Sequence, residues 1–181
     1  IAGQLEKRMD PRLMMALGLA MYVAAFWLYS NMTAEAGFAQ LFLPQMLHGM
    51  AIVISFLPIT AIALGTLPPS EIQNASGLYN LMRNLGGAIG LAAINTIIAG
   101  RYDLHRDRLG ETITVARIPV SEAIGAAGED EGAAAAGLRM LVQLVEREAR
   151  VMTYNDVWLV MAATIAAGLL LIPLVRKVAH A

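Results

Sequence analysis

The chain has 181 residues, of which 57% are hydrophobic and 15% are charged, and its mean hydropathy is +0.59. A soluble domain is about 45–50% apolar and about 25% charged, so this composition indicates a protein that lies in lipid. The formal net charge of −1 excludes the basic field that nucleic acid requires, and the absence of cysteine excludes disulfides, thiolate metal sites and cysteine nucleophiles. Because the chain opens on Ile1 rather than methionine, we expect a fragment of a larger protein.

Four apolar segments are long enough to cross the hydrocarbon of a bilayer as helices, which takes about 20 residues each. They cover residues 13–32, 38–67, 75–100 and 157–175. The second contains Pro44 and Pro58, where we expect kinks or tilt. The sequence therefore predicts an all-α integral membrane protein with four transmembrane helices.

The first apolar segment also imitates a secretory signal, because Lys7 and Arg8 precede it and an A-x-A pattern lies at Ala34 and Ala36. A signal has an apolar core of about 7–15 residues, which is shorter than this segment, and three further apolar segments follow. We therefore interpret residues 13–32 as a transmembrane helix.

The short connections make the helices alternate in direction across the membrane. Residues 1–12 and the tail 176–181 then lie on one side, and the long segment 101–156 lies on the other. Tyrosine and tryptophan collect at membrane interfaces, and five of them fall on the second side: Trp27, Tyr29, Tyr102, Tyr154 and Trp158. Basic residues flank the membrane on both sides, so charge alone leaves the orientation open.

The segment 101–156 is expected to contain three parts. Residues 101–109 are charged and can extend the third helix beyond the bilayer, and residues 125–137 are rich in glycine and alanine and are expected to be flexible. Apolar residues recur at helical spacing over about 138–152, which predicts an amphipathic helix that rests on the membrane or on the protein's own surface.

Polar residues within a membrane are expensive, so they are the first functional candidates. At about 100° per residue, six residues of the third helix share an arc of roughly 120°: Ser76, Asn80, Arg83, Asn84, Gly87 and Asn95. Gly86 and Gly90 form a G-x-x-x-G pattern on the adjoining face, where another helix can approach closely. One interpretation is that Arg83 and the asparagines line or gate a water-filled path. The alternative is that Arg83 lies near the interface and reaches out of the lipid.

In the second helix, Gln45 and His48 share one face. A histidine in lipid can relay protons, but the four predicted helices contain no Asp or Glu, which favours a neutral His48 bonded to a neighbouring helix. No motif of a hydrolase, metalloprotease or nucleotide-binding loop occurs, so no catalytic or metal site is predicted. We interpret His105, among Asp103, Arg106 and Asp107, as part of a solvated helix end.

Several ordered motifs resemble the last four helices of EmrB/QacA-type drug:proton antiporters, which are fourteen-helix members of the major facilitator superfamily. They are L-P-Q-M-L-H-G from Leu43, L-P-P-S-E from Leu67, A-S-G-L-Y-N-L-M-R-N-L-G-G-A-I-G from Ala75, and Y-N-D from Tyr154. His48 stands where that pattern has glutamine. The motifs are spread over nearly the whole chain.

The resemblance implies a C-terminal portion of a proton-coupled multidrug efflux antiporter that works by alternating access in the inner (plasma) membrane. It implies no cofactor beyond the coupling proton, and it implies hydrophobic small-molecule substrates. The partners would be the bilayer, a periplasmic membrane-fusion adaptor and an outer-membrane channel. It also places the segment 101–156 on the periplasmic or extracellular side and the two ends in the cytoplasm.

Three alternatives stay open at this point. The first is an exporter of an endogenous metabolite, such as a fatty acid or a siderophore, on the same fold. The second is a self-standing four-helix membrane anchor or subunit. The third, a membrane enzyme, has no catalytic residues to support it.

Overall fold

The computed structural model describes residues 10–65, 67–68, 70–112 and 131–174. These residues form four long helices: α2 (Pro11–Tyr29), α3 (Phe38–Leu64), α4 (Ile72–Thr112) and α6 (Glu131–Leu171). A short 3-10 turn, Ile172–Leu174, ends the described part of the chain, which contains no strand. Each of the four helices is long and apolar enough to cross a membrane. The predicted fold class, an all-α membrane protein with four such helices, is confirmed.

Local sequence signals fix where the first two helices begin. Asp10 precedes α2, and its Oδ1 atom accepts a hydrogen bond from the backbone N–H of Arg12 at 3.1 Å. Pro11 occupies the first helical position, where its missing N–H is not needed. The backbone N–H of Gly37 donates to Oε1 of Gln40 at 3.1 Å, which closes the first turn of α3.

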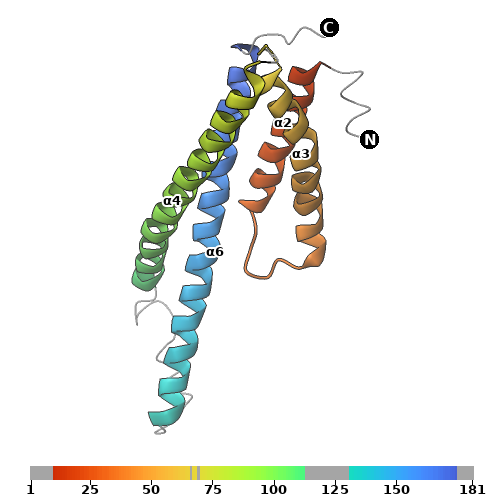
Figure 1. The fold of residues 1–181 in the computed structure, drawn as a ribbon. Helices are drawn as coiled ribbons and strands as arrows, with labels where there is room; N and C mark the ends of the chain where they lie inside the picture. The colour runs from red at the N-terminus through yellow and green to blue at the C-terminus, as the bar shows by residue number, and fades with distance from the viewer. Residues whose placement is uncertain (1–9, 66, 69, 113–130, 175–181) are drawn as a thin grey trace.

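Small residues bring α2 and α3 together as an antiparallel pair (Figure 1). Gly18 of α2 faces Ser55 of α3 so closely that a side chain at position 18 would overlap the serine hydroxyl. Ala25 of α2 and Ala51 of α3 are also fully buried. Small side chains allow helix backbones to approach closely in lipid, where helices gain little from hydrophobic association.

Helix α3 continues through both of its prolines. Pro44 and Pro58 are fully buried, so both rings contribute to packing inside the bundle. A proline removes one backbone hydrogen bond from a helix, and neighbouring helices can compensate for it within a membrane.

Helices α4 and α6 are each 41 residues long, roughly 60 Å, which is about twice the thickness of the hydrocarbon. The sequence predicted an amphipathic helix at 138–152 separate from a transmembrane helix at 157–175, whereas the structure has one continuous helix. Residues 131–137, expected to be flexible, form its first turns. Between Gly137 and Gly168 this helix contains no glycine or proline, so no residue there breaks it. Glu146 also pairs with Arg150, one turn later, at 3.6 Å, which supports the helix locally.

The other predicted boundaries differ from the structure by a few residues or lie outside it. Helix α4 extends the predicted 75–100 to Ile72–Thr112, while α2 and α3 each end three residues before the predicted 13–32 and 38–67. Most of the loop at 1–12 and the tail at 176–181 lie outside the described residues.

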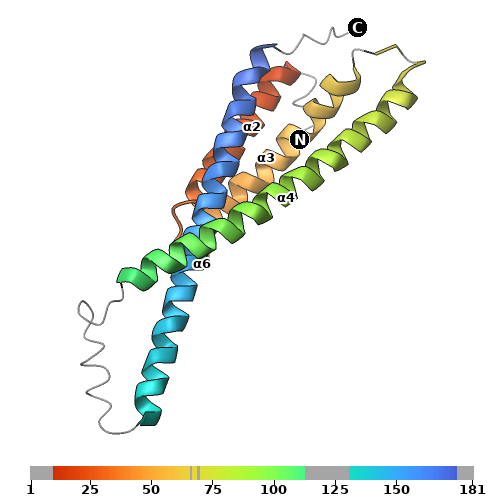
Figure 2. The same cartoon turned by 90° about the vertical axis from the view of Figure 1, so that its left-hand side faces the viewer.

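The four helices are not packed uniformly. Helix α2 packs against both α3 and α6, whereas α4 packs against α6 and makes few contacts with α3. Figures 1 and 2 together show that α4 lies against α6 in its C-terminal half and diverges from α6 towards its N-terminal end. The N-terminal half of α4 is therefore exposed over most of its circumference.

The contact between Gly18 and Ser55 predicts a steric effect of substitution. Gly18→Val should destabilise the chain by about 1–3 kcal/mol, because the backbone N of Ser55 is only 3.0 Å from a Cβ at position 18 and cannot rotate away. Thermal unfolding in detergent, followed by circular dichroism, measures the change. Gly49→Val is the matched control, because nothing lies within 4 Å of a Cβ there. Equal losses in both variants would show that the close approach is unimportant.

Candidate functional site

An aromatic cluster joins three helices inside the bundle. It consists of Tyr22, Phe26 and Tyr29 of α2, His48 of α3 and Trp158 of α6. The His48 ring centroid lies 5.4 Å from that of Tyr22 and 5.3 Å from that of Phe26. Trp158 stacks on Tyr29 at 4.8 Å and lies 5.2 Å from Phe26. Each such pair contributes about 0.5–1.5 kcal/mol beyond the area that it buries, so the cluster connects α3 and α6 through α2.

Gln45 and His48, which were predicted to share a face of α3, both point towards α2. The Tyr29 hydroxyl donates a hydrogen bond to Gln45 Oε1 at 2.5 Å, which fixes the direction of the Tyr29 ring. Among the described residues, the His48 ring contacts the rings of Tyr22, Phe26 and Tyr29, all on α2.

The predicted polar residues of α4 lie apart from this cluster. Asn80, Arg83, Asn84 and Asn95 are exposed, and no described residue covers them. Gly86, Gly87 and Gly90, the predicted positions of close helix packing, have nothing described within 4 Å of where a Cβ would lie. The structure therefore brings Gln45 and His48 together with α2, and it does not bring either of them to the α4 residues.

Asn80 and Arg83 of the polar stripe lie on the same face of α4 that meets α6 further along the helix. In the C-terminal half, this face contains Ile94, which is partly buried, and His105, which is buried. At about 100° per residue, Asn80 and Arg83 lie within roughly 50° of the direction of these residues. The face that α6 covers near one end of α4 thus continues as an exposed polar stripe where the helices diverge.

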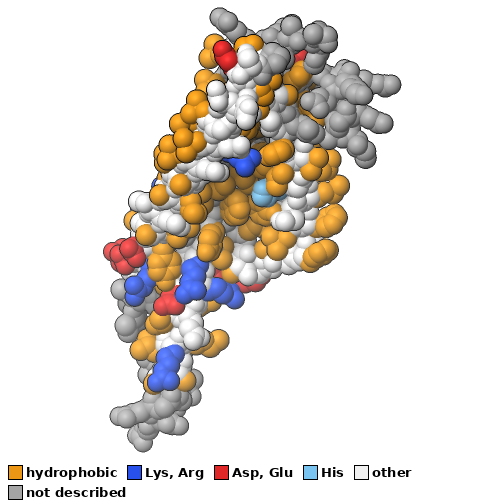
Figure 3. Space-filling model, viewed as in Figure 1, with side chains coloured by type: hydrophobic (Ala, Val, Ile, Leu, Met, Phe, Trp, Pro, Cys, Tyr) orange, Lys and Arg blue, Asp and Glu red, His pale blue; other side chains and the backbone are white. Residues whose placement is uncertain are grey.

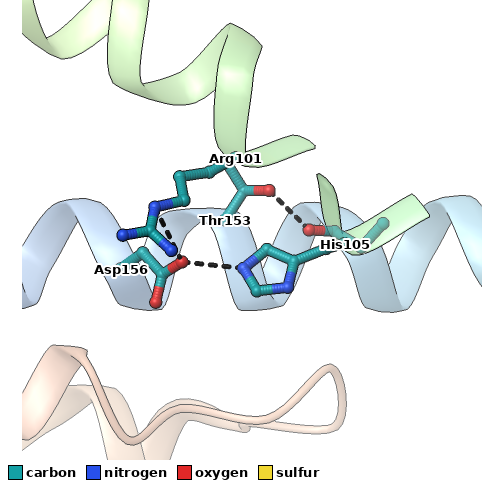
Figure 4. A network of polar contacts seen from close by, with 5 residues as sticks. Arg101, His105, Thr153 and Asp156 are labelled. Carbon is teal, nitrogen blue, oxygen red and sulfur yellow. Dashed lines mark hydrogen bonds and ion pairs between the residues drawn. The ribbon is translucent and has the colours of Figure 1, made fainter. Parts of the chain in front are cut away.

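A polar contact between α4 and α6, here named the α4–α6 junction, consists of Arg101, His105 and Asp156 (Figure 4). His105 Nε2 lies 2.7 Å from Asp156 Oδ2, and Arg101 Nε lies 3.6 Å from the same oxygen. His105 is only 7% exposed, so the interpretation of this residue as part of a solvated helix end is wrong. Figure 3 shows that most charged side chains on the visible face gather towards this end of the molecule.

Sequence reasoning missed the junction because its members are far apart in the chain. His105 and Asp156 are separated by 51 positions, and nothing local reveals that they meet. The available signal was that Arg101 and His105 lie one turn apart on a helix, while Asp156 is the last acid before an apolar segment. Asn155, next to it, donates from Nδ2 to the backbone oxygen of Met32 at 2.8 Å and so holds the α2–α3 connection against α6.

Within the described ranges, no group of three or more histidine, aspartate and glutamate side chains is placed to hold a metal ion. The features that remain are membrane-length helices, an aromatic cluster inside the bundle and an exposed polar stripe. Together they define the class of the protein, which is a helical multi-pass membrane protein.

The comparisons with known proteins identify its relatives. The chain is 33% identical over 105 residues to the colistin resistance protein EmrB of Acinetobacter baumannii, a match that covers 58% of this chain and 20% of that protein. It is 32% identical over 115 residues to the multidrug export protein EmrB of Escherichia coli K12, covering 62% and 22% of the two chains. The fatty acid resistance protein FarB of Neisseria gonorrhoeae is 27% identical over 114 residues, covering 63% and 22%.

No family model and no solved structure matches the chain. The chain spans about a fifth of the length of the curated relatives that it matches. The predicted resemblance to EmrB-type transporters of the major facilitator superfamily is confirmed by these matches. Together with the four membrane-length helices, they place the chain in the inner (plasma) membrane as a multi-pass protein, and the relatives are exporters and transporters rather than enzymes.

The aromatic cluster predicts a large loss of stability on truncation of its central ring. Phe26→Ala should lower the free energy of unfolding by about 3 kcal/mol or more, because Phe26 is only 3% exposed and contacts rings from all three helices. Heating in detergent, followed by size-exclusion chromatography of the folded fraction, measures the loss. The control is Trp27→Ala, which removes a larger ring that is 58% exposed at the adjacent position. If both variants lost equal stability, the cluster would not be a stabilising centre.

Proposed function

We propose that this chain forms part of a proton-coupled efflux antiporter, which exports hydrophobic small molecules by alternating access. Relatives named as multidrug export and resistance proteins support this proposal, as do the four membrane-length helices. Because the chain spans about a fifth of those relatives, the proposed activity is that of a larger set of helices to which this chain contributes.

One observation carries the proposal, namely the exposed polar stripe on the N-terminal half of α4. An arginine at the centre of a transmembrane helix costs about 2.5–3.5 kcal/mol on insertion scales, and lipid offers asparagine no hydrogen-bond partner. Arg83, Asn80 and Asn84 therefore need protein or water around them, and the described helices supply neither. A stripe of this kind is suited to line a water-filled path that other helices complete.

A second class of substrate is also supported by one of the relatives. One relative is named a fatty acid resistance protein, so an amphipathic endogenous metabolite is an alternative cargo on the same fold. The positive charge of Arg83 is compatible with an anionic head group. Parallel export assays with a fatty acid and with a neutral drug distinguish the two candidates.

We also propose that α4 and α6 reach a partner beyond the bilayer. Both helices are about twice as long as the hydrocarbon is thick, and their excess length lies at the same end of the bundle (Figure 2). If this end is periplasmic, as the resemblance implies, it is the place where a membrane-fusion adaptor and an outer-membrane channel would meet the transporter.

The stripe predicts a specific requirement for Arg83. In the full-length protein, Arg83→Ala should reduce export at least about tenfold when the variant is expressed at the normal level. Arg83 is the charged residue that α4 contributes to the proposed path, and without it the path no longer orients the polar groups of a substrate. Uptake of a fluorescent substrate into inverted vesicles measures export. Leu85→Ala is the control, because Leu85 is 50% exposed on the opposite face of the same helix. Unchanged export by Arg83→Ala at normal expression would remove Arg83 from the path.

A further inference from the structure

His105 is buried although it lies beyond the apolar part of α4. Its side chain is 9% exposed, and Nε2 lies 2.7 Å from Asp156 Oδ2. Its other ring nitrogen, Nδ1, is also buried, and no described residue bonds to it. Asp156 Oδ2 therefore interacts with both His105 Nε2 and Arg101 Nε. His105 Nδ1 has no partner among the described residues.

This geometry distinguishes the two protonation states of His105. A neutral imidazole carries one N–H, and the carboxylate beside Nε2 places that hydrogen on Nε2. Nδ1 is then an unprotonated nitrogen without a donor. A second proton binds at Nδ1 and creates a buried N–H with no acceptor among the described residues, which is costly. The added positive charge is attracted by Asp156, but this single carboxylate then faces two cations, Arg101 and His105.

The surroundings of His105 contain few groups that offset this added charge. On α6, Asp156 is the acid, while Ala149 and Thr153 are uncharged, and the Thr153 hydroxyl already donates to the Ala149 carbonyl at 2.7 Å (Figure 4). On the α2–α3 connection, Glu35 is 83% exposed and lies 3.8 Å from Arg147 of α6. The charged residues of α4 within one turn of His105 are all exposed, and they are Arg101, Asp103, Arg106, Asp107 and Arg108.

We infer that His105 and Asp156 form a proton-binding site, and that proton binding there loosens α4 from α6. While His105 is neutral, its Nε2–H and Arg101 both bind Asp156 and hold the two helices together. When Nδ1 gains a proton, no described residue accepts from the new N–H, so we expect water to enter between the helices or the ring to leave its place. The inference concerns the contact between two helices and does not depend on the transport function proposed above.

The position of this site gives it influence over the rest of α4. Helix α4 packs against α6 along its C-terminal half and makes few contacts with α3, so the α4–α6 junction is where the described chain holds it. The exposed stripe with Arg83 lies further along the same face. A change in the junction is therefore transmitted to that stripe through a continuous helix.

The distance between the two helices tests the inference. Spin labels are attached to two cysteines, introduced as Asp107→Cys and Gln143→Cys at exposed positions. The full native protein is used in lipid nanodiscs, and any cysteines elsewhere in it are replaced. Pulsed electron paramagnetic resonance then measures the distance distribution from about pH 8 to about pH 5, which brackets the usual titration of histidine. We expect the distribution to become longer and broader as the pH falls.

Three variants assign the response. His105→Gln keeps a donor for Asp156 but does not titrate, so its distance should stay short at every pH. Asp156→Asn removes the carboxylate and should give the longer distance already at high pH. Asp103→Asn makes the same change at an exposed acid outside the junction and should respond as the native protein does.

The inference is overturned if the distance between the two labels in the otherwise native protein stays constant or shortens as the pH falls. It is equally overturned if the His105→Gln variant responds to pH as the native protein does. If Asp156→Asn fails to insert into the membrane, a comparison of the pH responses of His105→Gln and Asp103→Asn still decides the question.

Discussion

The hydrocarbon of a bilayer offers no hydrogen bonds, and the structure of this chain follows from that constraint. The backbone satisfies itself within four long helices, as it must in lipid. Helices gain little from hydrophobic association there, so α2 and α3 rely on close approach at Gly18 and Ser55. Polar side chains must be covered by protein or by water, which gives the exposed stripe of α4 its significance.

Besides the close approach of Gly18 to Ser55, two contacts of different chemistry join the helices. The aromatic cluster joins α2, α3 and α6 through contacts between rings, one of which is the imidazole of His48. The α4–α6 junction depends on one carboxylate oxygen that serves a histidine and an arginine. Ring contacts thus join three of the helices, while the fourth, α4, meets α6 at a contact between charged and polar side chains.

The sequence predicts the number and approximate position of the membrane helices, because an apolar run of about twenty residues is long enough to span the hydrocarbon and too long for an ordinary buried helix. It also places Gln45 and His48 on one face, although only the structure identifies α2 as the helix that they meet. A helix at 138–152 was predicted, but not that it begins at residue 131 and continues unbroken into the transmembrane helix. An amphipathic helix and a transmembrane helix have the same local propensity, and only their surroundings differ. The burial of His105 depends on Asp156, 51 residues away, and composition around either residue indicates solvent.

Because α4 packs against α6 near one end only, it can act as a lever whose pivot is the junction with Asp156. Arg83 lies 22 residues from His105, or roughly 33 Å along a straight helix, so a tilt of about 5° at the pivot displaces the backbone at Arg83 by roughly 3 Å. That displacement is comparable to the diameter of a water molecule. An adjustment of a single side chain at the junction can thereby move the polar stripe of α4, with no refolding in between.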